Sequence, residues 1–270
     1  MADHSSVAIL GVGAMGEALF SGLKRAGWAA GDLSLCVRRE DRATELAKRS
    51  RSLITLNPIE AIEDRDVIVV AVKPRDVAAL LERLKTRVGK HQMILSLAAG
   101  VTTASYEATL GAVAVVRAMP NTPALVGEGV TGIAKGAYAN GDHIKLATEI
   151  LGAVGAVQFM DESLLDAVTA VSGTGPAYVF LMAEALTEAA VREGLPRDIA
   201  ETFVHQTIRG AGHLLTDTEG SPAELRSQVT SPGGTTAAAV HVLEERGFRA
   251  LLEDAVRAAA RRSAELGEQG

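Results

Sequence analysis

Val7-Ala8-Ile9-Leu10-Gly11-Val12-Gly13-Ala14-Met15-Gly16 is the stretch that decides the first half of the fold. An apolar run leads into glycines spaced as GxGxxG, and residues 19–26 then repeat apolar side chains at helical spacing. Gly11 permits a tight turn, Gly13 leaves room for a pyrophosphate, and Gly16 allows the helix to pack closely on the strand. In this order of strand, turn and helix, the motif predicts a dinucleotide-binding site.

Short apolar segments and helical segments alternate after this motif. Further strands are expected at 33–37, 53–56, 67–72, 93–98, 113–118, 129–135 and 157–160. A run as uniformly apolar as Val67-Ile68-Val69-Val70 is typical of a parallel strand in a sheet with helices on both faces. We therefore predict an α/β N-terminal domain, residues 1–161, with a Rossmann-like doubly wound sheet that binds its ligand at the carboxyl ends of the strands.

Basic residues follow the second expected strand, where an NAD-binding site usually carries an acidic residue. They are Arg38 and Arg39. Guanidinium groups suit a 2′-phosphate, so the pair favours NADPH over NADH; a solvated basic loop is the other interpretation. Lys73, Ala99 and Asn121 end later strands and are expected around the cofactor. A surface lysine at a turn is the alternative for Lys73.

From residue 162 onward the sequence predicts helices and no strands. The expected helices span 162–171, 177–193, 198–216, 221–229, 232–246 and 248–266. Ser221-Pro222-Ala223-Glu224 is a capping box with proline at the first helical position. Residues 177–190 are apolar on more than one face, so this helix is expected to be buried in a bundle that pairs with a second subunit. Residues 162–270 are therefore predicted to form an all-α C-terminal dimerisation domain.

Within this helical half, Val229-Thr230-Ser231-Pro232-Gly233-Gly234-Thr235-Thr236 has the composition of an anion site. Ser231 is expected as N-cap and Pro232 as the first helical residue. Two glycines let a ligand approach the backbone, and unpaired amides with the helix dipole favour a carboxylate. The hydroxyls of Ser231, Thr235 and Thr236 could donate to it. An ordinary capped helix start is the alternative.

Composition argues against several other functions. A net charge of −6 and an aromatic content of 3% disfavour nucleic-acid binding. The single cysteine, Cys36, allows no internal disulfide. The N-terminus shows no signal-peptide pattern, and the longest uncharged run, 167–183, is shorter than the ~20 residues of a membrane span. We predict a cytoplasmic protein without a membrane, nucleic-acid or metal partner.

The distribution of lysine bears on the reaction. The last lysine is Lys145, so the helical half has none. Ketone reduction needs a general acid at the oxygen, and hydroxyacid dehydrogenases resemble one another in using a lysine of their helical domain. The nitrogen of a cyclic imine can arrive already protonated, so hydroxyls and a carboxylate clamp would suffice. The sequence therefore favours C=N over C=O as the reacting bond.

Several blocks spread over residues 7–265 form a family pattern. They are VAVKP (70–74), SLAAGV (96–101), RAMPNTP (117–123), DE (161–162), DAVT (166–169), SGTGPAY (172–178) and the segment 225–244, which contains residues 229–236. In these blocks the chain resembles the pyrroline-5-carboxylate reductases. Thr174 stands where serine is common in the family, which keeps the hydroxyl.

The resemblance implies NAD(P)H-dependent reduction of 1-pyrroline-5-carboxylate to L-proline, the last step of proline biosynthesis. It implies cofactor binding by Leu10, Gly11, Val12, Gly13, Ala14, Met15, Arg38, Asn57, Ala71, Val72, Lys73 and Ala99. It implies substrate binding by Glu162, Val229, Ser231, Gly234, Thr235 and Thr236, and a further carboxylate near the substrate at Glu219. Thr236 would be the catalytic residue, as proton donor or hydrogen-bond partner of the ring nitrogen. Family members pair through their helical domains, and some form a decamer, a ring of five dimers.

Three alternatives remain open. A reductase of a six-membered cyclic imine acid would have the same composition, and only substrates would separate the two. A hydroxyacid dehydrogenase is disfavoured by the lysine-free helical half. A non-catalytic NADPH-binding sensor would keep the fold without the chemistry, although it would not need the hydroxyls of residues 231–236.

Overall fold

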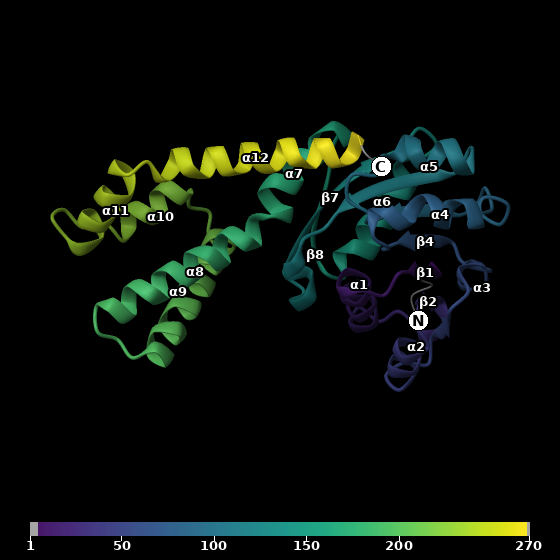
Figure 1. The fold of residues 1–270 in the computed structure, drawn as a ribbon, viewed down its shortest axis with the longest axis horizontal. Helices are drawn as coiled ribbons and strands as arrows, with labels where there is room; N and C mark the ends of the chain where they lie inside the picture. The colour runs from purple at the N-terminus through teal and green to yellow at the C-terminus, as the bar shows by residue number, and fades with distance from the viewer. Residues whose placement is uncertain (1–4, 269–270) are drawn as a thin grey trace. The chain divides into compact units, whose positions relative to one another are not determined.

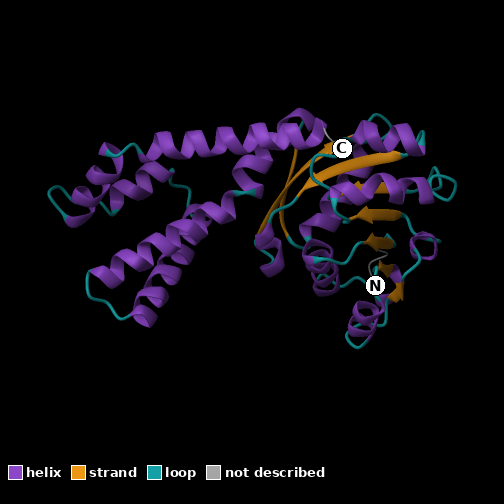
Figure 2. Ribbon diagram, in the orientation of Figure 1, coloured by secondary structure: helices purple, strands orange, loops and turns teal. Residues whose placement is uncertain are grey.

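The computed structural model describes residues 5–268. It divides into two compact units, one comprising the chain up to Thr174 together with the residues from Ala258 onward, the other Gly175–Arg257. All strands belong to the first unit, and the second is helical (Figures 1 and 2). The boundary between residues 161 and 162 expected from the sequence lies earlier in the chain than this division and stays a prediction.

An eight-stranded sheet forms the centre of the first unit. Its strands are β1 (Val7–Leu10), β2 (Leu33–Cys36), β3 (Leu53–Thr55), β4 (Val67–Val70), β5 (Met93–Ser96), β6 (Ala114–Met119), β7 (Gly129–Lys135) and β8 (Gly155–Phe159). They lie in the order β3-β2-β1-β4-β5-β6-β7-β8, and every neighbouring pair is parallel except β6 and β7. The predicted doubly wound α/β sheet is confirmed, with β7 and β8 at one edge running opposite to the other strands.

The strand order reverses between β1 and β4, which is where ligands bind in such sheets. The register places Leu10 beside Cys36 on one side and Val70 on the other. Two hydrogen bonds continue this register beyond the strands. The Gly11 N–H donates to Cys36 O (3.0 Å) and the Ala71 N–H to Leu10 O (2.9 Å). The residues that follow β1, β2 and β4 therefore emerge together at one edge.

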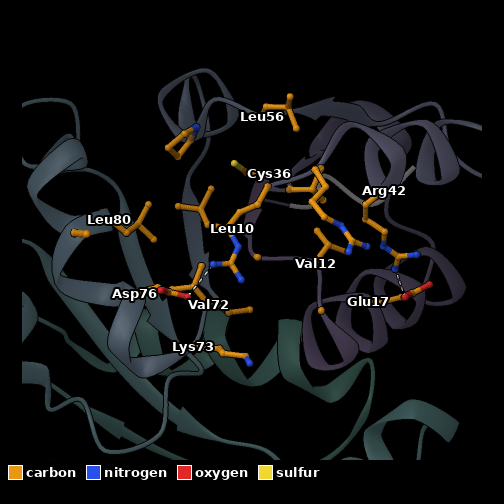
Figure 3. Close-up of a pocket in the computed structure, with 18 of the residues that line it drawn as sticks. Leu10, Val12, Glu17, Cys36, Arg42, Leu56, Val72, Lys73, Asp76 and Leu80 are labelled. Atoms are coloured by element: carbon orange, nitrogen blue, oxygen red, sulfur yellow. Dashed lines mark hydrogen bonds and ion pairs between the residues drawn. The ribbon is translucent and has the colours of Figure 1, made fainter. Parts of the chain in front are cut away.

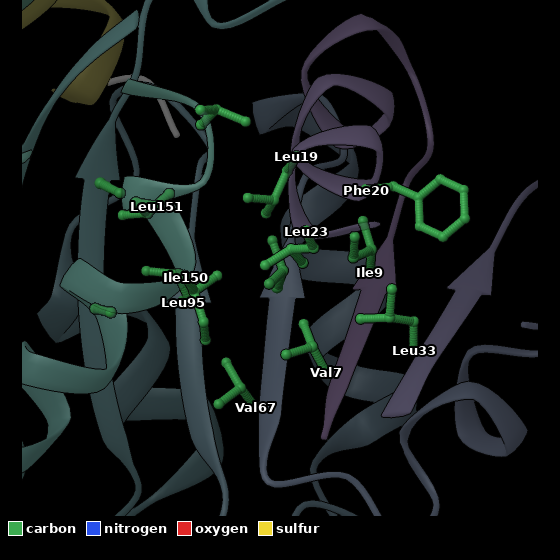
Figure 4. Close-up of a cluster of buried hydrophobic side chains, with 14 of the residues drawn as sticks. Val7, Ile9, Leu19, Phe20, Leu23, Leu33, Val67, Leu95, Ile150 and Leu151 are labelled. Atoms are coloured by element: carbon green, nitrogen blue, oxygen red, sulfur yellow. The ribbon is translucent and has the colours of Figure 1, made fainter. Parts of the chain in front are cut away.

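Helices cover both faces of the sheet because its strands are apolar on both sides. One face packs against α1 (Ala14–Arg25), α2 (Glu40–Ala47) and α6 (Gly141–Gly152); the other packs against α3 (Pro58–Ile62), α4 (Pro74–Leu84) and α5 (Thr103–Leu110). Alternate side chains of β1 enter the two cores: Ile9 joins Leu19 and Leu23 in one, shown in Figure 4, and Leu10 joins the other.

The first helix predicted for the helical half, over 162–171, is divided into shorter pieces in the structure. A 3₁₀ turn (Glu162–Leu164), α7 (Leu165–Val168) and a π-helical turn (Thr169–Gly173) replace the predicted helix over 162–171; α8 (Gly175–Arg192), α9 (Arg197–Asp217), α10 (Pro222–Gln228), α11 (Thr235–Glu245) and α12 (Phe248–Glu268) follow. The capping box is confirmed: the Glu224 N–H donates to Ser221 Oγ (3.3 Å), and the Ser221 N–H donates to Glu224 Oε2 (2.7 Å).

One predicted helix start is wrong. Ser231 and Pro232 precede α11, which begins at Thr235 with Gly234 as its N-cap. Gly233 has φ +69°, a left-handed conformation that interrupts any helix started at Pro232. The Gly234 N–H donates to Ser231 O (3.0 Å), so these residues form a turn ahead of the helix. The N-terminus of the helix therefore lies at Gly234 and Thr235.

Burial of the helix over 177–190 inside a bundle is also wrong for the single chain. The corresponding helix, α8, packs on α9, yet Phe180 and Leu181 are 62% and 67% exposed and Phe203 of α9 is 66% exposed. The run Glu162–Arg192 is long and apolar enough to cross a membrane, by length and composition alone, and only 11% of its most apolar window is buried. The absence of a membrane partner therefore stays a prediction.

The end of the chain returns to the first unit, and this explains why residues from Ala258 onward group with it. Ser263 of α12 donates to Asp166 Oδ1 at 2.7 Å, and Ser263 is buried. At Gly100, a β-carbon would lie 3.4 Å from the Cα of Gly267, so the two backbones are in close contact. The last turns of α12 are thereby held against the α/β unit.

Candidate functional site

A pocket of about 740 Å³ opens at the carboxyl ends of β1, β2 and β4, a size typical of ligand sites (Figure 3). Its lining comes from the turn after β1, the segment after β2, α2, the start of α3, and the segment after β4 with α4. The lining residues are Leu10, Gly11, Val12, Gly13, Ala14, Glu17, Cys36, Val37, Arg38, Arg39, Arg42, Glu45, Leu56, Pro58, Ala71, Val72, Lys73, Arg75, Asp76, Ala79, Leu80 and Arg83.

The glycines have separate roles in shaping this pocket. Gly11 has φ +98°, and a β-carbon there would lie 2.8 Å from the Ala71 carbonyl oxygen. A β-carbon at Gly16 would collide with the carbonyl oxygen of Gly11. Gly13 faces open space and is the N-cap of α1, with no side chain capping the helix. The first amides of α1 are thus available to an anion that approaches over Gly13, and the turn fits a pyrophosphate.

Charge in the pocket is opposite to that of the chain. Six basic and three acidic side chains line it, a formal excess of three positive charges, whereas the whole chain carries −6. Glu17, in the first turn of α1, is paired with Arg42 and, at 2.8 Å, with Arg49. Arg38 Nη1 lies 3.1 Å from Asp76 Oδ2. An anionic ligand such as a dinucleotide fits this lining.

Cys36 lines the pocket with an uncharged side chain. Burial raises the pKa of its thiol to about 11, with a smaller opposing effect of Arg83 and a smaller supporting one of Glu60. The thiol is therefore protonated near pH 7 and adds no negative charge to a pocket for an anion.

Most of the residues predicted for the cofactor come together here. Leu10, Gly11, Val12, Gly13, Ala14, Arg38, Ala71, Val72 and Lys73 line the pocket. Met15, Asn57 and Ala99 do not. Met15 packs against a buried core cluster, Asn57 Oδ1 caps α3 by accepting from the Ile59 N–H (3.1 Å), and Ala99 is exposed after β5. Asn121, also expected near the cofactor, is buried and accepts from the Val130 N–H (2.9 Å).

Other residues that line the pocket were not predicted from the sequence. Asp76, Leu80 and Arg83 of α4 are spaced four and three apart and therefore share a helix face. That spacing, on the helix that follows a strand at the switch point, is the signal that could have found them. Glu17 belongs to α1 and Arg42 to α2, so no spacing within one element could have predicted that they pair.

Glu162 lies in the first unit, against α5 and β6. Its Oε1 accepts from the Thr103 N–H (2.9 Å) and from Arg117 Nη1 (3.2 Å), and its Oε2 accepts from Thr103 Oγ1 (2.7 Å). The Arg117 side chain is only 8% exposed, so the carboxylate neutralises a nearly buried guanidinium. These contacts fix the orientation of Glu162.

The predicted substrate segment belongs to the second unit. Val229, Ser231 and Thr235 are exposed, and Gly234 and Thr236 are half-buried. A β-carbon at Gly234 would collide with Ser231 Oγ, so only glycine leaves that hydroxyl in place. The first amides of α11 lack partners within the helix and start beside the hydroxyls of Thr235 and Thr236. This arrangement suits a carboxylate. Within residues 5–268, no three His, Cys, Asp or Glu side chains are grouped to hold a metal ion.

Two sequence models of protein families match the chain. Residues 162–266 match pyrroline-5-carboxylate reductase dimerisation. Residues 6–100 match the family described as NADP oxidoreductase, coenzyme F420-dependent. The first match spans the helical part of the chain and the second covers the glycine-rich turn with the strands around it.

Several relatives that match over nearly their whole length are pyrroline-5-carboxylate reductases. The chain is 41% identical to pyrroline-5-carboxylate reductase of Pseudomonas aeruginosa over 265 residues, 97% of each protein. Its structure is similar to that of a pyrroline-5-carboxylate reductase of Coxiella burnetii, with a TM-score of 0.93, 38% identity, and coverage of 98% and 99%. It is also similar to a Plasmodium falciparum pyrroline carboxylate reductase solved with NADP bound, with a TM-score of 0.85, 30% identity, and coverage of 97% and 98%.

Proposed function

The chain belongs to the pyrroline-5-carboxylate reductase family, and from this premise we propose that it reduces 1-pyrroline-5-carboxylate to L-proline, the last step of proline biosynthesis. The observation that carries the proposal is the start of α11, where free amides and the hydroxyls of Thr235 and Thr236 form a carboxylate site. A dinucleotide-binding sensor without chemistry would have no use for it. The same chain supplies the positively charged pocket for the reductant.

The pocket of the first unit takes the cofactor, with NADPH preferred and NADH the alternative. The first amides of α1 bind the pyrophosphate over Gly13, and Arg38 binds the 2′-phosphate. When bound, the reduced nicotinamide supplies the hydride. Beyond the pocket-lining residues, Met15, Asn57 and Ala99 belong to the proposed cofactor set through their places beside the turns after β1, β3 and β5.

The α11 segment holds the substrate. Its carboxylate sits beside Gly234 on the amides of Thr235 and Thr236, with the Ser231 and Thr235 hydroxyls as donors, and Val229 provides apolar contact. Thr236 hydrogen-bonds the ring nitrogen. The imine nitrogen carries its proton before reduction, so hydride addition at carbon leaves a neutral secondary amine and no further proton is required in that step.

Glu162 completes the proposed substrate set as an acidic group whose orientation Thr103 and Arg117 hold. We assign the cofactor to residues 1–161 and dimerisation with substrate binding to residues 162–270. The exposed apolar helices pair with a second copy of the chain, and assembly of five such dimers into a decamer is the further step we propose. The enzyme works in the cytoplasm.

The test follows the absorbance of the reduced nicotinamide with 1-pyrroline-5-carboxylate, beside the six-membered imine acid and beside NADH. Fast oxidation with the five-membered ring supports the reaction, and the two comparisons decide ring size and cofactor. Oxidation with neither ring, from folded protein that binds NADPH, would favour the sensor.

Thr236→Ala is expected to lower kcat about 100-fold, as loss of one positioned donor does in other enzymes, while the Kd of NADPH stays the same. Thr236→Ser keeps the hydroxyl and is the matched control, with most of the turnover retained. A large loss of NADPH affinity in Thr236→Ala would remove Thr236 from its catalytic role.

A further inference from the structure

Arg38 and Asp76 meet in the cofactor pocket from two different walls. Arg38 follows β2, and Asp76 lies in the first turn of α4, which follows β4. Arg38 Nη1 and Asp76 Oδ2 are 3.1 Å apart, the ion pair drawn as the dashed line at Asp76 in Figure 3. Both residues line the pocket. The guanidinium proposed to bind the 2′-phosphate is therefore already paired with an anion of the protein.

The other acidic side chains of the pocket, Glu17 and Glu45, do not pair with Arg38. Glu17 and Glu45 are both engaged by Arg42 and Arg49, on the side of α1 and α2. Asp76 faces Arg38, with Arg75 Nε 4.0 Å from its other oxygen. Among the acidic groups that line the pocket, Asp76 is the one placed at Arg38.

A ligand phosphate can displace Asp76 from Arg38. The Arg38 side chain is 74% exposed and that of Asp76 is 32% exposed, and ion pairs this accessible to water are weak. A phosphate monoester carries up to two negative charges near neutral pH and has three acceptor oxygens. It can accept hydrogen bonds from two nitrogens of the guanidinium at once. Asp76 accepts from Arg38 through one contact, Nη1 to Oδ2.

Resting on the proposed function, we infer that Asp76 sets the cofactor preference of this pocket by competing with the 2′-phosphate for Arg38. A cofactor with the phosphate must release Arg38 from Asp76 and then lies near the remaining carboxylate. A cofactor with a free 2′-hydroxyl leaves the pair in place. Asp76 therefore disfavours NADPH selectively and keeps NADH usable.

The test compares two fragments that carry no nicotinamide, 2′,5′-ADP and 5′-ADP, by calorimetric titration of the full-length protein. In Asp76→Asn we expect 2′,5′-ADP to bind about twofold to fivefold tighter, the range set by a weak exposed ion pair, with 5′-ADP unchanged. In steady-state kinetics the KM for NADPH falls by the same factor and kcat does not change. Asp76→Ser removes the carboxylate in a second way and is expected to behave alike.

Glu82→Gln is the matched control. Glu82 lies on the same helix, loses the same charge, and pairs with Lys85 outside the pocket lining. Equal tightening in Glu82→Gln would show a general charge effect and overturn the inference. So would unchanged or weaker binding of 2′,5′-ADP in both Asp76 variants, since weaker binding would mean that Asp76 orients Arg38 for the phosphate.

Arg38→Ala separates failure of the inference from failure of the proposed function. It should weaken binding of 2′,5′-ADP and leave that of 5′-ADP unchanged, and Asp76→Asn should then add less selectivity in the Arg38→Ala background than in the unchanged protein. If Arg38→Ala weakens both fragments equally or neither, the proposed phosphate site and the inference fail together. If Arg38→Ala behaves as expected and the Asp76 variants do not, only the inference fails.

Discussion

The α/β unit buries the apolar residues of its strands, whereas the helical unit leaves large apolar residues exposed. In the first, every residue of β1, β2, β4 and β5 is buried, because helices of the same chain cover both faces of the sheet. In the second, Phe180, Leu181 and Phe203 are more than 60% exposed, and few residues are buried. The first closes its core within one chain, and the second presents the surface of a homodimer, in agreement with the dimerisation match over residues 162–266.

The contrast extends to function. The cofactor pocket is lined by residues 10–83 of the first unit alone, whereas the segment proposed for the substrate belongs to the unit with the exposed apolar helices. Binding of a nucleotide fragment should therefore need only a folded chain. Turnover should need the dimer as well. Four experiments, each with its control, test this contrast.

The largest effect is expected in the sheet core. Ile9→Ala empties a fully buried position of β1 and should lower the free energy of unfolding of the first unit by about 2–5 kcal/mol. Urea unfolding followed by circular dichroism measures it, and the loss should not depend on protein concentration. Leu181→Ala is the counterpart on the exposed face of α8: its effect should grow with concentration, because it acts through the dimer. The same concentration dependence for both variants would contradict the contrast.

A charge on the exposed helices is expected to separate the subunits. Phe203→Glu should raise the Kd of the dimer at least about 30-fold, equivalent to about 2 kcal/mol, because an unpaired carboxylate would be buried on association. Analytical ultracentrifugation measures the Kd. Activity should fall at low protein concentration while 2′,5′-ADP still binds.

Tyr138→Glu is the control for this charge. Tyr138 is an exposed aromatic residue of the first unit, and its substitution should leave the dimer intact. A monomer from Tyr138→Glu, or a dimer from Phe203→Glu, would place the interface elsewhere. Recovery of the unchanged protein with lipid vesicles, lost in Phe203→Glu, would instead indicate a membrane as the cover of α8 and α9.

A smaller loss is expected at Glu162. Glu162→Gln removes the charge opposite Arg117, whose guanidinium is nearly buried, and should lower the free energy of unfolding by about 1–3 kcal/mol. Glu128→Gln, at an exposed carboxylate of the same unit, should change it little. A rise in the KM for the imine without any loss of stability would mean that Glu162 serves the substrate more than the fold.

The last test concerns the thiol in the pocket, where no residue is changed and no loss of stability or assembly is expected. Because burial raises the pKa of Cys36 to about 11, about 0.1% of it is thiolate at pH 8, and alkylation by iodoacetamide should be at least about 100-fold slower than for a free cysteine. The rate should rise with pH up to about 11, since a raised pKa delays ionisation. NADPH should slow it further. A plateau near pH 8.5 would show an ordinary thiol, and protein unfolded in urea supplies that reference.

The elements with strong local signals were predictable. β1 and β7 have the predicted bounds, and the other strands differ from theirs by a few residues, because buried parallel strands are continuously apolar. The capping box at Ser221 was predictable since its contacts join residues three apart. The start of α11 was not, because Ser231 and Pro232 have the right chemistry for a helix start and Gly233 adopts a left-handed conformation that composition does not reveal.

The sequence by itself determined the dinucleotide turn, the doubly wound sheet, the helical second half and the family, since each depends on residues that are close together in the chain or on whole blocks of it. Only the tertiary structure decided which charges meet. Arg38 and Asp76 are 38 residues apart, and Glu162 is 45 residues from Arg117. Parallel strands bring the ends of distant segments to one edge of the sheet, and a pair formed there leaves no periodic trace in the sequence.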